Sequence, residues 1–508
     1  MTIARTWSVA LVGVDGALVE VEADLSNQTP EFKIIGLPDK ALGEAVQRVH
    51  NACANSGIPL PRRRLTVNLS PASLPKQGSG FDVAIAIASL ATEGAMDAAS
   101  VASTAHLGEL GLDGRLRPVP GILPAVVAAA RAGVRRVVVP FGNADEARLV
   151  EGVDVLGAVN LAAVAAWHGA EIDVPDEVAV AAGVEESEDL APLDLADVVG
   201  QAEAVEALVV AAAGGHHLLM CGPPGAGKTM LARRLPGILP DLDDRAALAT
   251  ASIRSLSGRR ISALSRTPPF EAPHHSASVA ALVGGGSRIV RPGAIARASD
   301  GVLFLDEAGE FQRGALDALR QPLESATIDI HRAGFSASFP ARFQLVLATN
   351  PCPCGNYGVR GGTCTCTPMS IRRYLGRLSG PLLDRIDIEL SLARVSVARR
   401  AAATGTVTTA DARARVIEAR TRAAHRLRGT PWRTNVEVPG TWLRDGPAAA
   451  PADVRRPLDA ALHRGALTLR GYDRVLRLAW TVCDLAGRSR LTADDIGRSL
   501  FLKKGLTS

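Results

Sequence analysis

The sequence is poor in aromatic residues, and it lacks both a long apolar segment and a strong excess of charge. Aromatic residues make up 4% of the 508 residues, so Ala, Val and Leu must form most of the core. No apolar run reaches the ~18 residues that a membrane span needs. The N-terminal segment soon becomes acidic, unlike a secretory signal. The formal net charge of +4 identifies no partner by itself. We therefore expect a cytoplasmic protein without membrane contact.

Cysteine is also scarce, and its distribution excludes a disulfide framework. Four of the seven cysteines form two tight pairs, Cys352-Pro-Cys354 and Cys364-Thr-Cys366. Four thiolates in a reducing compartment suit a tetrahedral Zn²⁺. The pairs are closer than the usual spacing of about two to four intervening residues. Unligated or redox-active thiols therefore stay open as the alternative to zinc.

The strongest motif is a phosphate-binding loop that runs Gly-Pro-Pro-Gly-Ala-Gly-Lys-Thr. Its glycines let backbone N–H groups approach a phosphate chain closely. Lys228 then neutralises the β- and γ-phosphates, and the Thr229 hydroxyl ligates Mg²⁺. An apolar run at 217–221 and a helix-forming run at 230–235 give the loop its strand–helix context. The expected nucleotide contacts are Gly222, Pro223, Pro224, Gly225, Ala226, Gly227, Lys228 and Thr229.

Two later apolar runs end in polar residues that suit hydrolysis. The run at 301–307 ends in Asp306 and Glu307. We expect Asp306 to hold Mg²⁺ with Thr229, and Glu307 to polarise the attacking water. The run at 343–350 ends in Asn350, which is placed to orient that water. The alternative for Asn350 is an ordinary turn residue at the end of a strand.

The length of the chain predicts several domains, in a multidomain α/β fold. Residues 1–170 alternate strand and helix patterns and should form an α+β domain. Residues 171–195 contain many carboxylates and no Lys or Arg, which predicts an extended acidic linker. Residues 196–392 should form the nucleotide-binding α/β domain with a parallel sheet. Residues 393–508 are rich in Ala and Arg with helical periodicity, which predicts a helical lid.

Several longer motifs point to a family. They are Gly36-Leu-Pro-Asp-Lys-Ala-Leu-Gly-Glu-Ala, Val67-Asn-Leu-Ser-Pro-Ala, Ala272-Pro-His-His, Asn350-Pro-Cys-Pro-Cys-Gly and Pro381-Leu-Leu-Asp-Arg-Ile-Asp. Across nearly the whole chain they resemble the ComM/YifB group of magnesium-chelatase-like AAA+ ATPases. The resemblance implies a Lon-protease-like N-terminal domain, an AAA+ motor and a helical lid. It also implies a homo-hexamer that binds single-stranded or branched DNA and uses ATP to drive branch migration during natural transformation.

The resemblance assigns roles to three residues of the motor. Asn350 corresponds to sensor one, Arg385 to the arginine finger and Arg470 to sensor two in the lid. The developing charge on a γ-phosphoryl group needs cations, and an arginine finger would reach the neighbouring subunit's phosphate. For Arg385 the alternative is a surface ion pair with Asp384 or Asp387. Arg470 has the corresponding alternative of an ordinary lid residue.

The N-terminal domain departs from the pattern of an active Lon-type peptidase. In this comparison Gly80 stands at the nucleophile position, Ser79 is out of register, and Leu123 replaces the lysine base. A serine hydroxyl without a neighbouring base is a poor nucleophile at neutral pH. We expect no peptidase activity, and we expect the domain to act as a scaffold or as a binding module for a protein partner.

Two insertions would face the central pore of such a ring. One is the Gly-rich segment 272–288, and the other alternates over 327–339 like a hairpin around Ala333-Gly334. Their basic residues would contact DNA phosphates, unless they are simply solvated loop residues. We expect His274 and His275 to be structural or pore-loop residues rather than metal ligands. The proposed DNA contacts are Arg288, Arg291, His331 and Arg332.

Three functions compete: a DNA motor, a motor subunit for metal insertion into a porphyrin, and a regulatory scaffold that binds proteins. Porphyrin chelatase motors resemble only the central part of this chain, so the N-terminal domain and the cysteine cluster favour the DNA motor over the second function. Nothing in the sequence separates the DNA motor from the scaffold.

Overall fold

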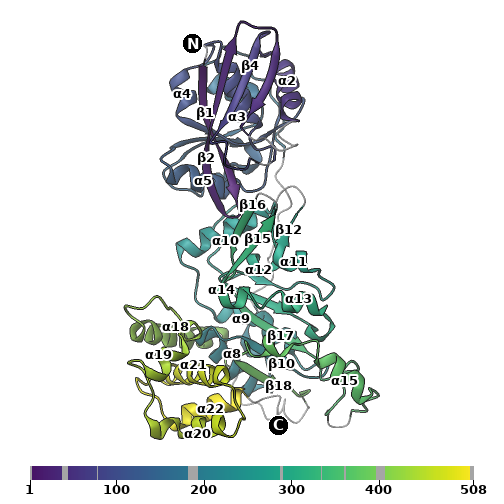
Figure 1. Ribbon diagram of the computed structural model, residues 1–508, viewed down its shortest axis with the longest axis vertical. Helices are drawn as coiled ribbons and strands as arrows, with labels where there is room; N and C mark the ends of the chain where they lie inside the picture. The colour runs from purple at the N-terminus through teal and green to yellow at the C-terminus, as the bar shows by residue number, and fades with distance from the viewer. Residues whose placement is uncertain are drawn as a thin grey trace.

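The computed structural model describes residues 3–36, 44–76, 78–180, 193–286, 290–332, 335–359, 362–395 and 407–503. The molecule is elongated, with three parts in succession (Figure 1). The N-terminal part lies at one end, the phosphate loop lies in the central part, and helices of the C-terminal part pack beside the far end of the central part. Throughout the described ranges, no helix has the length and apolar character needed to cross a membrane.

The N-terminal part is built on a seven-stranded mixed sheet in the order β3-β4-β2-β1-β5-β8-β9. Strands β1, β2 and β4 pair antiparallel, and the remaining pairs are parallel. Helix α3 is buried along nearly its whole length against β1 and β2, and α5 also contacts the sheet. The elements are β1 Ile3–Val12, β2 Asp15–Ser26, β3 Glu31–Ile35, α2 Ala45–Asn55, β4 Arg64–Ser70, α3 Asp82–Ala91, α4 Ala98–Ala102, β5 Thr104–His106, α5 Ile122–Arg131, β8 Arg136–Pro140, α6 Ala144–Ala147, β9 Asp154–Ala158 and α7 Leu161–Trp167.

The central part contains a five-stranded parallel sheet in the order β11-β14-β17-β10-β18. Strands β10, β14 and β17 are buried at every position, as expected of parallel strands covered on both faces. The carboxyl ends of parallel strands meet at one edge, so the segments after β10, β14 and β17 converge there. The elements are α8 Ala202–Gly214, β10 Leu218–Cys221, α9 Lys228–Ile238, β11 Phe270–Glu271, β14 Val302–Leu305, β17 Gln344–Thr349, α15 Pro368–Leu375, α16 Gly380–Leu383 and β18 Ile388–Ser391.

The described C-terminal part is helical, as the periodicity of residues 393–508 predicts. Helices α18 and α21 pack on α8 of the central part. Asp387, which is fully buried directly before β18, anchors this packing by pairing with Arg474 of α21 and accepting the His217 N–H at 3.0 Å. The elements are α18 Thr409–Arg426, α19 Gly440–Asp445, α20 Ala452–His463, α21 Leu469–Leu485 and α22 Ala493–Lys503.

Both predicted insertions lie on the side of the central part that meets the N-terminal part (Figure 1). The predicted hairpin is present as β15 Thr327–Arg332 and β16 Phe335–Pro340. The other insertion contains α11 Val279–Val283 and β12 Gly284–Gly285, and β12 pairs with β13 Arg291–Pro292, which follows the insertion. Apolar residues of the two insertions share one core cluster, which includes Leu282, Val283, Ile328 and Ile330. The insertions therefore form one packed unit.

Helix α10 (Asp244–Leu256) joins the N-terminal and central parts by packing against α5. The Ser255 hydroxyl donates to the buried carboxylate of Glu146 at 2.6 Å, and the Gly121 N–H donates to the Ser255 carbonyl at 3.1 Å. Leu11 and Val14 of the N-terminal part pack against a buried cluster that contains residues of α10 and of the β16 strand. The two parts thus share a continuous apolar and hydrogen-bonded seam.

Candidate nucleotide site

The phosphate loop joins β10 to α9, the strand–loop–helix arrangement that the sequence predicts. Gly225 and Gly227 have φ angles of +77° and +82°, in the left-handed region that favours glycine. At Gly222 a Cβ atom would lie 2.6 Å from the Leu392 carbonyl oxygen. Gly225 and Gly227 are therefore required by the backbone of the loop itself, and Gly222 by the close approach of the segment after β18.

Lys228 begins α9 directly after the loop glycines and is only 9% exposed. Its Nζ donates to the Gly222 carbonyl at 2.6 Å, to the Pro223 carbonyl at 3.1 Å and to Asn350 Oδ1 at 2.9 Å. Burial lowers the pKa of this ammonium group. The structure thus brings Lys228 and Asn350 together, and a phosphate oxygen would be a stronger acceptor for the same ammonium.

Thr229 and Asp306 face each other across the start of α9 and the end of β14. The Thr229 hydroxyl donates to Asp306 Oδ2 at 2.6 Å, and Asp306 Oδ1 accepts the Glu307 N–H at 2.9 Å. Hydroxyl and carboxylate oxygens are the hard ligands that Mg²⁺ prefers, so this pair fits the ion. The cavity here has a volume of about 500 Å³ and is lined by Pro224, Gly225, Ala226, Gly227, Lys228, Thr229, Met230, Asp306, Glu307, Thr349 and Asn350.

Glu307 has a contact that the sequence does not predict. Its carboxylate Oε2 lies 3.0 Å from Nδ1 of His275, and its φ of 52° places it in the left-handed region, which is uncommon for a residue other than glycine. His275 follows β11, which is the neighbour of β14 in the sheet. Only the strand order brings the two residues together, so no sequence spacing reveals the pair.

Arg385 and Arg470 lie away from the phosphate loop of their own chain. Both line a larger cavity of about 770 Å³ between the central part and the C-terminal helices. Among the described residues, this cavity and the nucleotide cavity have no lining residue in common. Arg385 is 7% exposed and pairs with Glu324, rather than with the aspartates that the sequence offers as alternatives. Arg470 is exposed near the start of α21.

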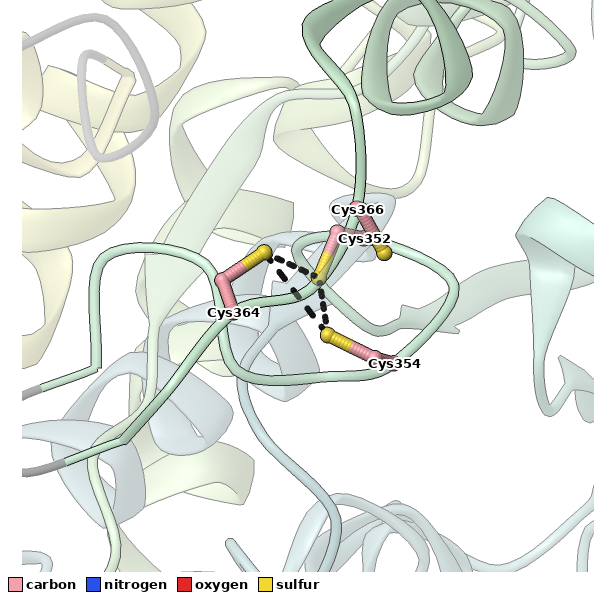
Figure 2. A group of neighbouring side chains, drawn as sticks. All are labelled: Cys352, Cys354, Cys364 and Cys366. Carbon is pink, nitrogen blue, oxygen red and sulfur yellow. Dashed lines mark hydrogen bonds between the residues drawn. The ribbon is translucent and has the colours of Figure 1, made fainter.

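The four clustered cysteines converge in a loop after β17 (Figure 2). The Sγ atom of Cys352 lies 3.4 Å from that of Cys354 and 3.8 Å from that of Cys364, and the Sγ atoms of Cys354 and Cys364 are 3.7 Å apart. All four Sγ atoms of the cluster lie within 4.8 Å of one another. A tetrahedral ZnS₄ site with Zn–S bonds of about 2.3 Å has S···S edges of about 3.8 Å. A disulfide bond would require an S–S distance of about 2.05 Å, so none of these pairs is bonded. Backbone N–H donation from Asn356 lowers the pKa of the Cys354 thiol to about 6, whereas desolvation and the neighbouring thiols raise the pKa of Cys364 to about 11. A bound cation would therefore have to displace the protons of the other thiols.

The cysteine loop packs directly against the phosphate loop. A Cβ atom added to Gly355 would lie 2.5 Å from Cδ of Pro224. Gly355 has a φ of +78°, so its left-handed backbone also favours glycine. A change in the conformation of the cysteine loop would therefore alter the packing of the phosphate loop at Pro224.

The predicted DNA contacts are only partly described. Arg291 in β13 and His331 in β15 have exposed side chains. Arg288 lies outside the described residues, and so does the side chain of Arg332, although its backbone pairs in β15. One side of the hairpin is occupied by the N-terminal part, because Ala337 and Phe339 belong to the buried cluster against which Leu11 and Val14 pack.

In the N-terminal part, the residues that were compared with the nucleophile and base of a peptidase contact groups other than each other. The Ser79 hydroxyl donates to the Glu109 carboxylate. The nearby Lys76 is 1% exposed, and its Nζ donates to the Gly36 carbonyl at 3.0 Å and to the Pro71 carbonyl. Leu123 is fully buried in a cluster with Ala251 of α10 and Ile261. The position predicted to have lost its base is thus part of the seam with the central part.

The parallel sheet, the phosphate loop and the Asp-Glu pair after β14 define an ATPase of the AAA+ type. Family models for the ChlI subunit of magnesium chelatase match residues 194–400 and 21–143, and a model for its C-terminal region matches residues 406–503. The chain belongs to the ComM/YifB group of magnesium-chelatase-like proteins.

Three relatives align over nearly their full length. An uncharacterized protein of Mycobacterium tuberculosis is 48% identical over 99% of both chains. Competence protein ComM of Haemophilus influenzae is 41% identical over 98% of this chain and 97% of its own. The uncharacterized protein YifB of Salmonella typhimurium is 39% identical over 98% of this chain and 95% of its own.

Proposed function

We propose that this protein is a ring-forming motor, a homo-hexamer, that couples ATP hydrolysis to movement along single-stranded or branched DNA. We further propose that it drives branch migration during transformation or recombination in the cytoplasm. The likeness to a protein named for competence supports the pathway. The exposed basic residues of the two insertions support contact with a polyanion.

The chemistry follows from the residues around the nucleotide cavity. Lys228 would neutralise the β- and γ-phosphates, and Thr229 with Asp306 would hold Mg²⁺. Glu307 would accept a proton from the attacking water, while Asn350, which contacts Lys228, would orient that water beside the γ-phosphate. Mg²⁺ supplies charge neutralisation between the phosphates when it is bound.

The position of two arginines is the main observation in favour of assembly into a ring. Arg385 and Arg470 share one cavity that is separate from their own phosphate loop. Phosphoryl transfer needs cations beyond Lys228, because charge spreads over the γ-phosphoryl oxygens. We propose that both arginines complete the nucleotide site of a neighbouring copy. A heterologous contact of this kind forms a ring when its rotation returns to the first copy.

The two other candidates make different predictions. A chelatase motor would hydrolyse ATP without any response to DNA, and would respond to a porphyrin-binding subunit instead. A regulatory scaffold would bind a protein through its N-terminal part and would not move DNA. In all three cases we expect that the N-terminal domain, a degenerate Lon-like fold, cleaves no peptide, because Ser79 contacts Glu109 rather than a lysine.

The deciding experiment measures ATP hydrolysis and strand movement together. Purified protein is assayed with single-stranded, duplex and forked DNA, and a labelled four-way junction reports branch migration. We expect forked or single-stranded DNA to stimulate ATP hydrolysis, and we expect branch migration of the four-way junction to require ATP. An ATPase that ignores all of these DNAs contradicts the motor and favours one of the alternatives.

We also propose that Cys352, Cys354, Cys364 and Cys366 hold a structural zinc ion. The S···S separations of the cluster support this assignment. Metal analysis of protein purified without chelators should find about one zinc per chain. Cys354→Ser should lower that content, and Cys53→Ser, a buried cysteine far along the sequence, is the matched control. Wild-type protein that is free of zinc and has four alkylatable thiols in the cluster rejects the site.

A further inference from the structure

Helix α15 has no role in the hydrolysis scheme or in the DNA contacts given above. It extends from the central part, away from the C-terminal helices and from the β15–β16 hairpin (Figure 1). Its inner face is fixed to the fold, because Ile371 and Tyr374 are buried and the helix packs on the short turn η3, Ala308–Glu310. Just beyond the helix, Nη1 of Arg377 donates to the Gly309 carbonyl at 2.6 Å. One face of α15 is therefore held by the central part, and the other face meets solvent.

The solvent face of α15 is basic. Met369, Arg372 and Arg373 are spaced i, i+3 and i+4, so they lie on one face of the helix. All three residues are exposed, and Met369 is 77% exposed. Within the part of the chain that the structure describes, neither of the two guanidinium groups has an ion-pair partner. The surrounding sequence adds to this charge, because the segment from Asn350 to Leu383 contains four arginines and no Asp, Glu or Lys.

The loop that precedes α15 also exposes an aromatic ring. Tyr357 is 54% exposed, and its N–H donates to Sγ of Cys352 at 3.3 Å, so the cysteine cluster holds its backbone. Helix α15 begins two residues after Cys366, whose Sγ atom belongs to the same cluster. The cysteine cluster thus anchors both the aromatic residue and the start of the basic helix. Aromatic rings that stack on bases, and cations that contact the phosphates, are the groups with which proteins bind single-stranded nucleic acid.

We propose that α15 and the cysteine loop form a second surface for single-stranded DNA, on which Arg372 and Arg373 contact phosphates and Tyr357 stacks on a base. This surface is separate from the two insertions, which lie nearer the N-terminal part (Figure 1). Duplex DNA offers phosphates but no open base face, so the exposed ring favours a single strand. The inference rests on the proposed function, because it gives the DNA motor a further contact with its strand.

The test measures binding of the full-length protein to a fluorescent oligothymidine by anisotropy across a salt series, with Mg²⁺ and a non-hydrolysable ATP analogue. Each phosphate contact with a single strand contributes about 0.7 to the slope of log K against log[salt]. Arg372→Ala/Arg373→Ala should therefore reduce this slope by about 1.4 for each engaged subunit, which corresponds to about 25-fold weaker binding at about 0.1 M salt. The matched control, Arg456→Ala/Arg464→Ala, removes two exposed arginines of the C-terminal part and should bind like wild type.

Substitutions of Tyr357 separate stacking from charge. Tyr357→Ala should weaken binding about five- to hundredfold without changing the salt slope, because a neutral ring is lost. Tyr357→Phe keeps the ring and should bind like wild type. In all of these variants the melting temperature and the DNA-independent rate of ATP hydrolysis should stay unchanged, because the substituted side chains are exposed.

Two results overturn the second surface alone. One is wild-type affinity and salt slope in Arg372→Ala/Arg373→Ala while Arg291→Ala weakens binding, which would leave the insertions as the DNA contact. The other is a smaller assembly of the double variant by light scattering, with weaker binding explained by that loss of subunits, which would make α15 a contact between copies of the chain. Failure of the proposed function is distinguishable, because wild-type protein would then bind no oligonucleotide even at low salt, and both proposals would fall.

Discussion

Replacing Arg385 with alanine tests whether a neighbouring chain completes the nucleotide site. The Arg385 side chain is 8% exposed, but its partner Glu324 is 59% exposed, so the pair is worth at most about 1 kcal/mol. An arginine at a phosphoryl-transfer site accelerates hydrolysis about 10³–10⁵-fold, which corresponds to about 4–7 kcal/mol. The guanidinium therefore gains more at a neighbour's γ-phosphate than it loses by leaving Glu324. We expect Arg385→Ala to bind ATP normally and to hydrolyse it about a thousandfold more slowly or worse.

Mixed assemblies separate a role in trans from a role within the chain. Lys228→Ala has a defective phosphate loop and an intact arginine, and Arg385→Ala has the reverse. In rings assembled at random from equal amounts, about a quarter of the interfaces join an intact loop to an intact arginine. Hydrolysis by the mixture should therefore recover to about a quarter of the wild-type rate, as measured by phosphate release.

The matched control is Glu324→Gln, which breaks the ion pair but keeps the guanidinium. We expect it to retain wild-type hydrolysis, because Glu324 holds Arg385 only within its own chain. Absence of recovery in mixtures whose subunits demonstrably exchange refutes the assignment in trans. An equal loss of activity in Glu324→Gln refutes it as well, because the defect would then lie in the ion pair.

Three further predictions address other parts of the molecule. Glu307→Gln should retain ATP through gel filtration while its turnover falls about 10²–10⁴-fold, and turnover at the wild-type rate would show that another group activates water. Arg291→Ala should weaken DNA binding similarly for all sequences and reduce the salt dependence measured by anisotropy, and a change confined to one sequence would contradict a phosphate contact. The pKa of Asp387 would be raised by burial alone, but Arg474 and His216 hold it well below its ordinary value. Its stabilisation is therefore present above the unfolded-state pKa near 4 and is lost as the pH falls below that value. Asp387→Asn should lower the free energy of unfolding by about 3–5 kcal/mol at pH 7 and by less at pH 3, and a loss that does not depend on pH would count against the ion pair.

The sequence predicts the parts of the nucleotide site that are each marked by a short local motif. The phosphate loop, the Asp306-Glu307 pair and Asn350 each end an apolar run, and the parallel sheet brings all of them to one edge. The helical character of the C-terminal part and the hairpin of the second insertion are also predicted, because their periodicity is local.

The remaining features depend on contacts between distant segments. His275 contacts Glu307 only because β11 and β14 are neighbours in the sheet. Arg385 pairs with Glu324, which is distant in sequence, and both residues line the larger cavity. The spacing of the four cysteines left zinc and free thiols open, and the convergence of their Sγ atoms, on which the zinc proposal rests, depends on how the loop after β17 folds. Periodicity specifies which face of an element is buried but does not specify which element covers it.

The seam along α10 has a consequence for dissecting the protein into fragments. Val290, Ile253, Leu256 and Phe339 of the central part are buried in the cluster that Leu11 and Val14 cover, and Ala251 and Ile261 are buried against Leu123. A motor fragment that begins near residue 194 would present these apolar side chains to water, and a contiguous patch of that kind promotes aggregation. A soluble fragment should therefore require polar substitutions along α10, and an insoluble unmodified fragment would say nothing about whether its ATPase machinery can fold.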